Sequence, residues 1–355
     1  MSPGLVSSVV CAGCGRVFAT HAGYLDLRPL TAFQEQTKYL DEALHADARH
    51  ESIAPPLLGS KVRYDMLRRF LKPGRGDRII DLGCGSGRTL AWTAPSGAEL
   101  TGIDIAPYFA PHAVQQSDLV LGDLRRLPIR DGSFAKAWSL DVLEHLSRPA
   151  LVEMLTEANR VLEERGALFV YTHVRKNGWL AGGTRMVNRF AAFCERRGWL
   201  DLNQERLRKS DHVNPLTDHD DLARVAAECG FTIERITYYT PIVGAFIENV
   251  LVRIAEKSLA RRAERAKSIP RVPSGKSTPG IVSPERTPGI VSDEARKEAR
   301  RAAQARVRRG GALYGALVML SWIMKIDVLA FGRFRSGPFF ALLRKTQPMP
   351  AKGRG

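Results

Sequence analysis

The chain has 355 residues and carries 53 Lys and Arg against 37 Asp and Glu, a formal net charge of +16. Residues 1–252 hold 30 basic and 30 acidic residues, so residues 253–355 carry the whole excess. This distribution argues against a nucleic-acid groove over the first part and favours an anionic surface as the partner of the last part. Five scattered cysteines do not suit a disulfide framework, and no basic residue precedes the short apolar run at 5–12, which argues against a secretory signal. We therefore expect a cytoplasmic protein.

The chain opens with a pair of cysteines, Cys11 and Cys14. The pair resembles the knuckle of a small zinc-ribbon-like module, which we place at residues 1–30. Structural zinc needs four ligands, and the nearest further candidate is His21. Of the two interpretations, a zinc site and a metal-free β cap, we favour the metal-free cap.

Two helices are expected next, at 31–49 and 61–71, and after them short apolar runs alternate with helical segments. The apolar runs predict strands at 78–82, 99–104, 118–122, 134–140, 166–173 and 231–238. Helices between them are expected at 88–94, 148–163 and 218–229. Gly166 and Gly230 follow two of these helices in the position where glycine commonly ends a helix. This alternation predicts an α/β fold with a mostly parallel sheet.

A glycine-rich turn follows the first of these strands. Asp81 lies at the tip of the strand, and Gly83, Gly85 and Gly87 follow at alternate positions. Glycine lets the backbone turn sharply and approach a ligand without a Cβ, and the helix that begins near Arg88 offers free N–H groups. An NAD-binding turn would have the spacing Gly-x-Gly-x-x-Gly, but here the third glycine comes one residue early.

Three further motifs follow in order. Asp104 ends the second strand, Gly122-Asp123 follows the third, and Ser139–His145 (Ser-Leu-Asp-Val-Leu-Glu-His) ends the fourth. With the glycine turn, these motifs resemble those of class I S-adenosylmethionine-dependent methyltransferases, in the branch of the ubiquinone- and menaquinone-type enzymes. The resemblance covers roughly residues 63–239 and resumes at 339–345. It implies a Rossmann-like, seven-stranded and mostly parallel sheet with helices on both faces, whose last strand is antiparallel.

The resemblance implies that S-adenosylmethionine is the cofactor. Asp81 and the glycine turn would hold its methionine portion, Asp104 its ribose hydroxyls, and Asp123 with the Leu124 amide its adenine. The residues expected to bind the cofactor are Asp81, Gly83, Cys84, Gly85, Gly87, Asp104, Ile105, Asp123, Leu124 and Leu140.

Catalytic residues are expected after the fourth strand. By resemblance, Leu140 and Asp141 would lie beside the transferred methyl group. His145 is the candidate proton acceptor, because histidine titrates near neutrality. His173 and His212 are alternatives, and many relatives need no dedicated base.

The methyltransferase core is expected at 73–240 and 336–346, with residues 31–72 as a helical lid over the cofactor. An insertion at 174–217 contains a basic amphipathic helix at about 185–197. In the family that the chain resembles, such a region usually lines the acceptor pocket. The alternative is a helix that only covers the edge of the sheet.

A second insertion, at 241–335, separates the sixth strand from the seventh. Its first limb is apolar at 241–254 and then basic. A Pro/Gly-rich linker, expected to be disordered at about 268–294, contains the sequence Thr-Pro-Gly-Ile-Val-Ser twice. The second limb mirrors the first, with a basic stretch at 295–309 and an apolar stretch at 312–324. We therefore expect a helical hairpin.

The apolar stretch 312–324 is too short to span a bilayer, and Lys325 and Asp327 interrupt its continuation. Apolar segments beside basic clusters suit a hairpin that lies in an anionic membrane interface. In the alternative, the two limbs pack on each other and on the sheet, and their charges are simply solvated.

These observations predict a methyltransferase, peripheral at the inner face of the membrane, that O- or C-methylates a small hydrophobic or lipid-linked acceptor. A nucleic-acid substrate is not expected, because residues 139–142 lack the Asn/Asp-Pro-Pro-aromatic motif of amino-methylating enzymes. Two alternatives remain. The chain could be a soluble RNA or protein methyltransferase that holds its partner with the basic hairpin, or a non-catalytic cofactor-binding membrane adaptor.

Overall fold

The computed structural model describes residues 8–12, 15–21, 23–28, 53–175, 178–203, 206, 212–268 and 311–346. The helix expected at 31–49, the linker expected at about 268–294 beyond its first residue, and the basic stretch at 295–309 lie outside this part of the chain.

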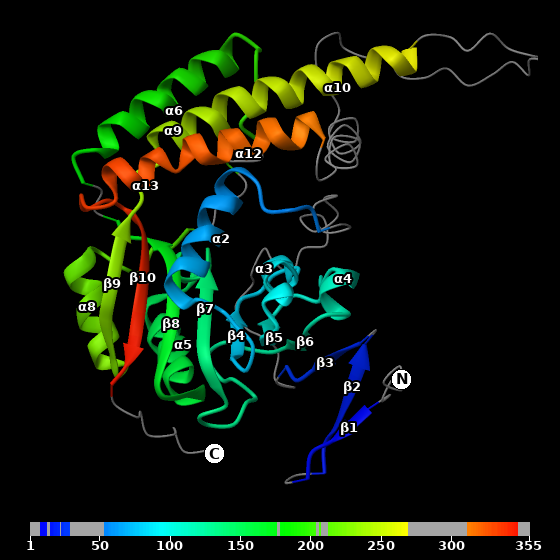
Figure 1. Ribbon diagram of the computed structural model, residues 1–355, viewed down its shortest axis with the longest axis vertical. Coiled ribbons are helices and arrows are strands. Elements are labelled where there is room, and N and C mark those ends of the chain that lie inside the picture. The colour runs from blue at the N-terminus through cyan, green and yellow to red at the C-terminus, as the bar shows by residue number, and fades with distance from the viewer. Residues whose placement is uncertain are drawn as a thin grey trace, which may run out of the picture.

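A mostly parallel sheet with helices on both faces forms the body of the protein (Figure 1). Its seven principal strands are β4 (Arg78–Leu82), β5 (Glu99–Asp104), β6 (Asp118–Leu121), β7 (Phe134–Leu140), β8 (Leu162–His173), β9 (Phe231–Tyr238) and β10 (Pro338–Lys345). They are hydrogen-bonded in the order β6-β5-β4-β7-β8-β10-β9, and β10 runs antiparallel to both of its neighbours. The predicted α/β class is confirmed.

The prediction of seven strands was wrong, because the described sheet has ten. β1 (Ser8–Val10), β2 (Val17–His21) and β3 (Tyr24–Asp26) form a small antiparallel ribbon, and β3 pairs in parallel with β6. The open backbone groups of an edge strand such as β6 are a ready template for another strand. The N-terminal cysteine segment therefore extends the main sheet instead of standing apart from it.

The expectation that Gly166 ends a helix was also wrong. α5 (Arg148–Val161) stops earlier, and β8 begins at once with Leu162. Arg165 adopts a left-handed φ of 59°, and the pairing register between β7 and β8 shifts near Phe134. Gly166 thus lies in an irregular opening of β8, where a bulge rather than a helix end requires an unusual backbone.

Alternate residues of the central strands face two separate cores. Ile80 and Leu82 of β4 pack with α5 and with α8 (His219–Glu228), whereas Ile79 packs with α2 (Leu58–Leu71) and α3 (Arg88–Thr93). Successive side chains of a strand point to opposite faces, so a fully apolar strand supports helices on both. The short helix α4 (Pro111–Val114) follows β5.

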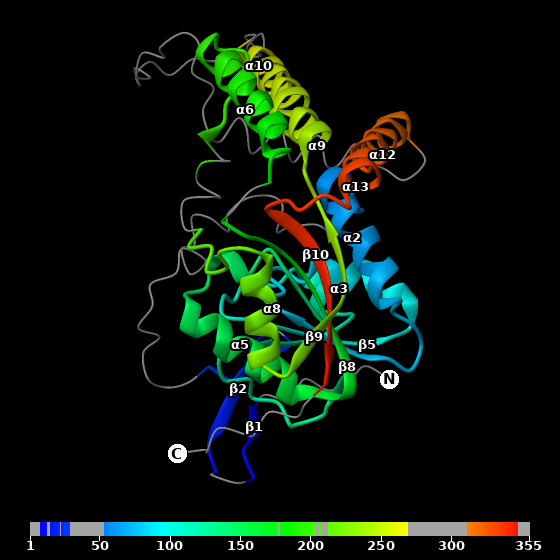
Figure 2. The ribbon, with the colours of Figure 1, turned by 90° about the vertical axis from the view of Figure 1, so that its left-hand side faces the viewer.

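A layer of helices lies across the carboxyl ends of the parallel strands (Figures 1 and 2). It consists of α6 (Ala181–Arg196), α9 (Ile242–Phe246), the π-helical turn η5 (Ile247–Val252), α10 (Arg253–Ser268), α12 (Ala312–Met324) and α13 (Ile326–Phe331). α6 comes from the first insertion, and the other helices come from the second. Both insertions therefore meet at the edge of the sheet where ligands of open α/β sheets bind.

Polar contacts fasten the second insertion to the rest of the protein. The fully buried carboxylate of Asp327 accepts hydrogen bonds from the backbone N–H groups of Val243 (3.0 Å) and Gly244 (2.7 Å), which joins α13 to α9. Ser321 Oγ accepts from the backbone N–H of Leu58 (2.7 Å), which joins α12 to α2. Glu248 Oε1 accepts a hydrogen bond from the backbone N–H of Gly59, the next residue of α2, at 3.1 Å. The start of α2 is therefore held by both limbs of the insertion.

We predict that Asp327→Ala lowers the free energy of unfolding by about 2 to 4 kcal/mol, because two buried N–H groups lose their acceptor. Urea denaturation measures the change. As a control, Glu234→Ala breaks only the surface ion pair with Arg344 and should cost about 1 kcal/mol or less. Equal effects of the two substitutions would contradict the role of Asp327 in joining the limbs.

Candidate functional site

The glycine turn after β4 has an unusual backbone and one open side. Gly83, Gly85 and Gly87 have positive φ angles of 83°, 54° and 77°, a region that side chains disfavour. A Cβ on Gly83 would lie 2.5 Å from Val142 Cγ2, and one on Gly87 would lie 2.6 Å from Ala113 Cβ. A Cβ on Gly85 would meet no atom within 4 Å. The turn is thus packed at both ends and leaves backbone accessible in the middle.

Two acidic residues lie beside this turn. Asp104 ends β5, and its carboxylate accepts hydrogen bonds from the backbone N–H groups of Gly85 (2.7 Å) and Ala106 (3.0 Å). Asp81 is only 3 % exposed, and its burial, together with the negative charge of Asp104, raises its pKa to about 8. A cationic ligand at the turn would favour the ionised form of Asp81.

Three further residues expected to bind the cofactor are buried or half-buried beside the turn and the strand ends. Cys84 is buried, and burial raises the pKa of its thiol, so it behaves as a packing residue here. Ile105 is half-buried at the end of β5, next to Asp104. Leu124 is half-buried and packs against the core that contains α5 and α8.

Asp123, which follows β6, is already engaged by a neighbour. The Nε atom of Arg125 lies 3.0 Å from Oδ1, and its Nη2 atom lies 2.8 Å from Oδ2. The backbone N–H of Arg125 also donates to Oδ1 at 2.9 Å. The sequence analysis did not foresee this ion pair, which fixes the carboxylate at the end of β6.

At the end of β7, Leu140 is half-buried and Asp141 adopts a left-handed φ of 56°. The Asp141 side chain is 42 % exposed, and its Oδ2 lies 3.4 Å from Nε of Arg63 on α2. The Arg63 guanidinium also lies over the ring of Tyr171, 5.5 Å from its centroid. Non-glycine residues in such backbone conformations are often found at functional sites.

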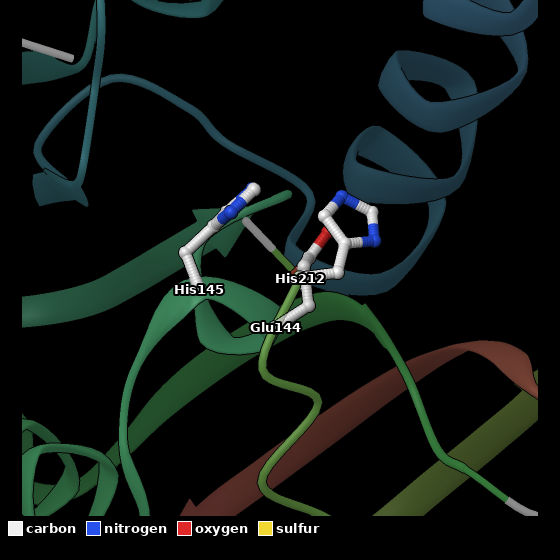
Figure 3. Close-up of side chains that lie close together, drawn as sticks. All are labelled: Glu144, His145 and His212. Carbon is white, nitrogen blue, oxygen red and sulfur yellow. The ribbon is translucent and has the colours of Figure 1, made fainter. Parts of the chain in front are cut away.

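Glu144, three residues further on, is the centre of a cluster of histidines. It is 1 % exposed, and its Oε2 accepts a hydrogen bond from Thr172 Oγ1 at 2.8 Å. His173 Nε2 lies 3.8 Å from its other oxygen. Figure 3 shows His145 and His212 beside the same carboxylate, and their ring centroids are 4.8 Å apart. All three candidate bases thus come together, although they lie far apart in the sequence.

Glu144 also anchors the first insertion through its backbone. Its carbonyl oxygen accepts hydrogen bonds from the N–H groups of Val213 (2.8 Å) and Asn214 (2.9 Å), which places His212 in the cluster. Burial and the charge of Asp141 raise the pKa of the Glu144 side chain to about 8. The carboxyl group is therefore poised to exchange a proton near neutral pH.

Two overlapping groups of these side chains could hold a metal ion. One is Glu144, His145 and His212, and the other is Asp141, Glu144 and His173. In each group the possible ligand atoms lie within 4.8 Å of one another. The sequence analysis did not predict a metal at this position.

A family model described as a methyltransferase domain matches residues 80–170, which run from β4 into β8. Over the centre of the sheet, the chain is thus similar to methyltransferase domains. The matched range includes the glycine turn, the three aspartates at the ends of β4, β5 and β6, and the segment with Asp141, Glu144 and His145.

Relatives support the same assignment over part of the chain. A sterol 4-C-methyltransferase of Caenorhabditis elegans is 30 % identical over 109 residues, which are 28 % of this chain and 32 % of that protein. A ubiquinone biosynthesis O-methyltransferase of Actinobacillus pleuropneumoniae is 26 % identical over 198 residues, 47 % of this chain and 82 % of that protein. For the sterol methyltransferase and three further relatives, the chain spans between 32 and 57 % of the relative's length.

Among solved structures, phosphoethanolamine N-methyltransferase 2 of Haemonchus contortus in complex with S-adenosylmethionine is 16 % identical to this chain. The two superpose with a TM-score of 0.47, over 88 % of this chain and 59 % of that one.

The turn and its two aspartates fit the cofactor of this class of domain. S-adenosylmethionine carries an ammonium, a sulfonium and two ribose hydroxyls, which are groups that carboxylates bind. Asp81 and Asp104 supply the carboxylates, and the open side of Gly85 lets the ligand approach the backbone. The adenine contact expected of Asp123 stays a prediction, because Arg125 already uses part of its hydrogen-bonding capacity.

Sequence reasoning missed two residues of the methyltransferase site. Glu144 lies in the short turn after β7, and its burial there depends on contacts with Thr172 and with the first insertion that the sequence does not reveal. Arg63 gave no signal, since its approach to Asp141 depends on how α2 crosses the sheet.

The N-terminal metal site stays a prediction. Cys11 lies between β1 and β2, whereas Cys14 lies outside the described residues. His21 ends β2, and the position of its side chain is not described.

We predict that Asp104→Ala weakens the binding of S-adenosylmethionine by at least about tenfold, because hydrogen bonds to a charged group contribute about 1.5 to 3 kcal/mol. Isothermal titration calorimetry measures the change. Glu99→Ala, at the exposed start of the same strand, is the matched control and should leave affinity unchanged. Unaltered affinity in Asp104→Ala would contradict the assigned role.

We also predict that cofactor affinity rises with pH below about 8. Asp81 is protonated in the free protein at neutral pH, and a bound cation favours its ionised form, so binding releases a proton. Affinity should rise by up to about tenfold per pH unit in this range. Calorimetry in buffers of different ionisation enthalpy measures the proton release. Asp81→Asn should abolish the part of the pH dependence that comes from this carboxyl group. If cofactor affinity depends on pH in the same way in that variant, Asp81 is not the group that releases the proton.

Proposed function

We propose that this protein is a methyltransferase that moves a methyl group from S-adenosylmethionine to an oxygen or carbon atom of a small hydrophobic or lipid-linked acceptor. It works at the surface of a membrane, as a peripheral protein on the cytoplasmic side. One observation carries the proposal: the glycine turn after β4 and the cluster of Glu144 with its histidines lie side by side at one edge of the sheet.

The two halves of the site meet at the end of β7. The glycine turn contacts β7 because Gly83 lies against Val142, and Glu144 follows two residues later. A methyl donor at the turn therefore has the cluster as its neighbour. Direct transfer requires donor and acceptor to be held together with water excluded, and this arrangement suits it.

The cofactor supplies the activated methyl group, and the chain supplies positioning and proton transfer. Where the acceptor is a hydroxyl, its proton leaves as the new O–C bond forms. A neutral imidazole of the cluster can accept that proton. His173 is well placed for this role, because the nearby Glu144 carboxyl stabilises the resulting imidazolium once it is ionised. Glu144 acts through His173 and is a positioning residue.

Several features support a hydrophobic acceptor. The buried ring of Tyr171 lies beside the cluster, 5.7 Å from the ring of His173, and the buried Tyr239 lies behind it at 6.4 Å. Two relatives are named for sterol methylation and for ubiquinone biosynthesis, and both names refer to hydrophobic compounds. The excess of basic residues after residue 252 supports action at an anionic membrane.

We predict that the purified protein transfers label from methyl-tritiated S-adenosylmethionine to the organic-solvent phase of a membrane lipid extract. Asp104→Ala should remove at least about nine-tenths of this activity through weaker cofactor binding, and Glu99→Ala should not. His173→Asn should lower kcat while cofactor affinity, measured by calorimetry, stays unchanged.

Other distributions of the label would decide against the proposal. Incorporation into RNA or protein, sensitive to salt, would identify the soluble alternative. Cofactor binding without transfer to lipid, RNA or protein fractions would identify a non-catalytic adaptor.

A further inference from the structure

We infer that the helical layer over the active site is a membrane-docking surface on which α12–α13 lies flat in the lipid interface instead of crossing the bilayer. This deepens the proposed function by naming the partner as a bilayer that contains anionic lipid, and by turning the carboxyl edge of the sheet toward it.

Exposed apolar side chains are concentrated on this layer. Nineteen large apolar side chains of the described residues are exposed, and fifteen of them lie on α6, α9 to α10, α12 to α13 and their flanks. We call these fifteen the apolar surface. They are Trp179, Met186, Phe190, Phe193, Trp199, Phe246, Leu251, Leu259, Leu313, Met319, Trp322, Ile323, Ile326, Leu329 and Phe334. Exposed apolar groups on this scale mark a site of interaction.

On α12–α13 the exposed residues form one stripe. Met319, Trp322, Ile326 and Leu329 are spaced by three or four residues, as one face of a helix requires. Their exposed fractions run from 47 to 77 %. The charged groups of the same segment bind the protein, and the Lys325 ammonium also lies over the ring of Trp322, 3.7 Å from its centroid. Lys325 forms an ion pair with Asp65 of α2, and the Asp327 carboxylate binds the start of α9.

Aromatic contacts connect the three parts of the apolar surface. Phe190 of α6 stacks on Phe246 of α9, with centroids 6.5 Å apart. Trp179, just before α6, meets Phe334, just after α13, at 6.2 Å. The exposed residues thus belong to a connected surface over both insertions.

Charge complementarity identifies the occupant as an anionic bilayer. Arg185, Arg189, Arg196 and Arg197 are exposed on or beside α6, among its exposed aromatic residues. The Arg197 guanidinium lies over the ring of Phe193, 5.2 Å from its centroid. Basic side chains next to Trp and Phe on an exposed helix are typical of helices in an anionic lipid interface.

The chain's own segment between α10 and α12 is poor in large apolar residues, with three Ile and four Val among its 42 residues. Residues 269–310 contain no Leu, Met, Phe, Tyr or Trp, but ten Lys and Arg. Their composition adds positive charge instead of apolar area.

Length alone would allow a different orientation. Ala312–Phe331 is a helical stretch long and apolar enough to cross a membrane, and 22 % of it is buried. However, its inner face is fastened to α2 through Ser321 and Lys325 and to α9 through Asp327. It also lies over α2, whereas α6 and α10 form a separate pair beyond α9 (Figure 2). A helix attached along one side to a folded domain presents its other side to the interface.

The experiment compares sedimentation of the full chain with phosphatidylcholine vesicles that contain or lack phosphatidylglycerol. The test variant replaces Met319, Trp322 and Leu329 with Glu, and the control replaces Val9, Val10 and Val17 of the N-terminal ribbon with Glu. The control has the same change in charge and also alters three exposed apolar residues. Wild type and control should bind the anionic vesicles, and the test variant should bind at least about tenfold more weakly.

A second measurement needs no destabilising variant. Lipids brominated at shallow positions should quench the exposed tryptophans Trp179, Trp199 and Trp322 more strongly than lipids brominated at the bilayer centre. The difference in quenching between wild type and Trp322→Phe isolates the contribution of Trp322. Stronger quenching from the centre would show that the helix spans the bilayer. Equal binding by test and control variants, no binding by wild type, or a wild-type dimer that the test variant dissociates would each overturn the inference. None of these readouts needs methyl transfer, so this inference and the proposed function can fail separately.

Discussion

The last strand of the sheet, β10, runs antiparallel between two strands that are parallel to each other. β9 therefore ends, and β10 begins, at the carboxyl edge. Any chain inserted between them must leave and return at that edge, however long it is. The same edge carries the cofactor turn and the Glu144 cluster. The antiparallel direction of β10 thus places the second insertion directly over the glycine turn and the Glu144 cluster.

α2 transmits this arrangement to the site. Its first backbone N–H groups, at Leu58 and Gly59, donate to Ser321 on one limb of the insertion and to Glu248 on the other. One turn later, Arg63 reaches Asp141 at the end of β7. Glu248 lies in the π-helical turn η5, a kind of irregularity that is frequent at functional sites. The helical layer, α2 and the end of β7 are consequently parts of one connected structure, in which displacement of the layer would displace Arg63.

Much of this could be predicted from the sequence, because the relevant signals are local. The bounds of β4, β5, β7 and β9 follow from short apolar runs, and acidic residues at strand ends mark the ligand-binding edge. What failed depends on distant partners. β3 has three residues and exists as a strand because β6 has a free edge. Glu144 gains its significance from His173 and His212, which reach it through β8 and the first insertion. The hydrophobic periodicity of a segment does not indicate which distant residues it will contact.

Lys325 and Asp327 illustrate the same limit in a way that bears on function. In the sequence they interrupt an apolar segment and indicate that it ends. In the fold, Asp327 binds the N–H groups of α9, and Lys325 pairs with Asp65 while it covers one face of the Trp322 ring. Trp322, Ile326 and Leu329 remain exposed on the outer face. Hydropathy read along the sequence averages the two faces of the helix α12–α13, but a lipid interface would contact only the outer face. The charges that argue against a membrane span therefore strengthen flat docking, because they attach the apolar helix to α2 and α9 while its outer face stays exposed.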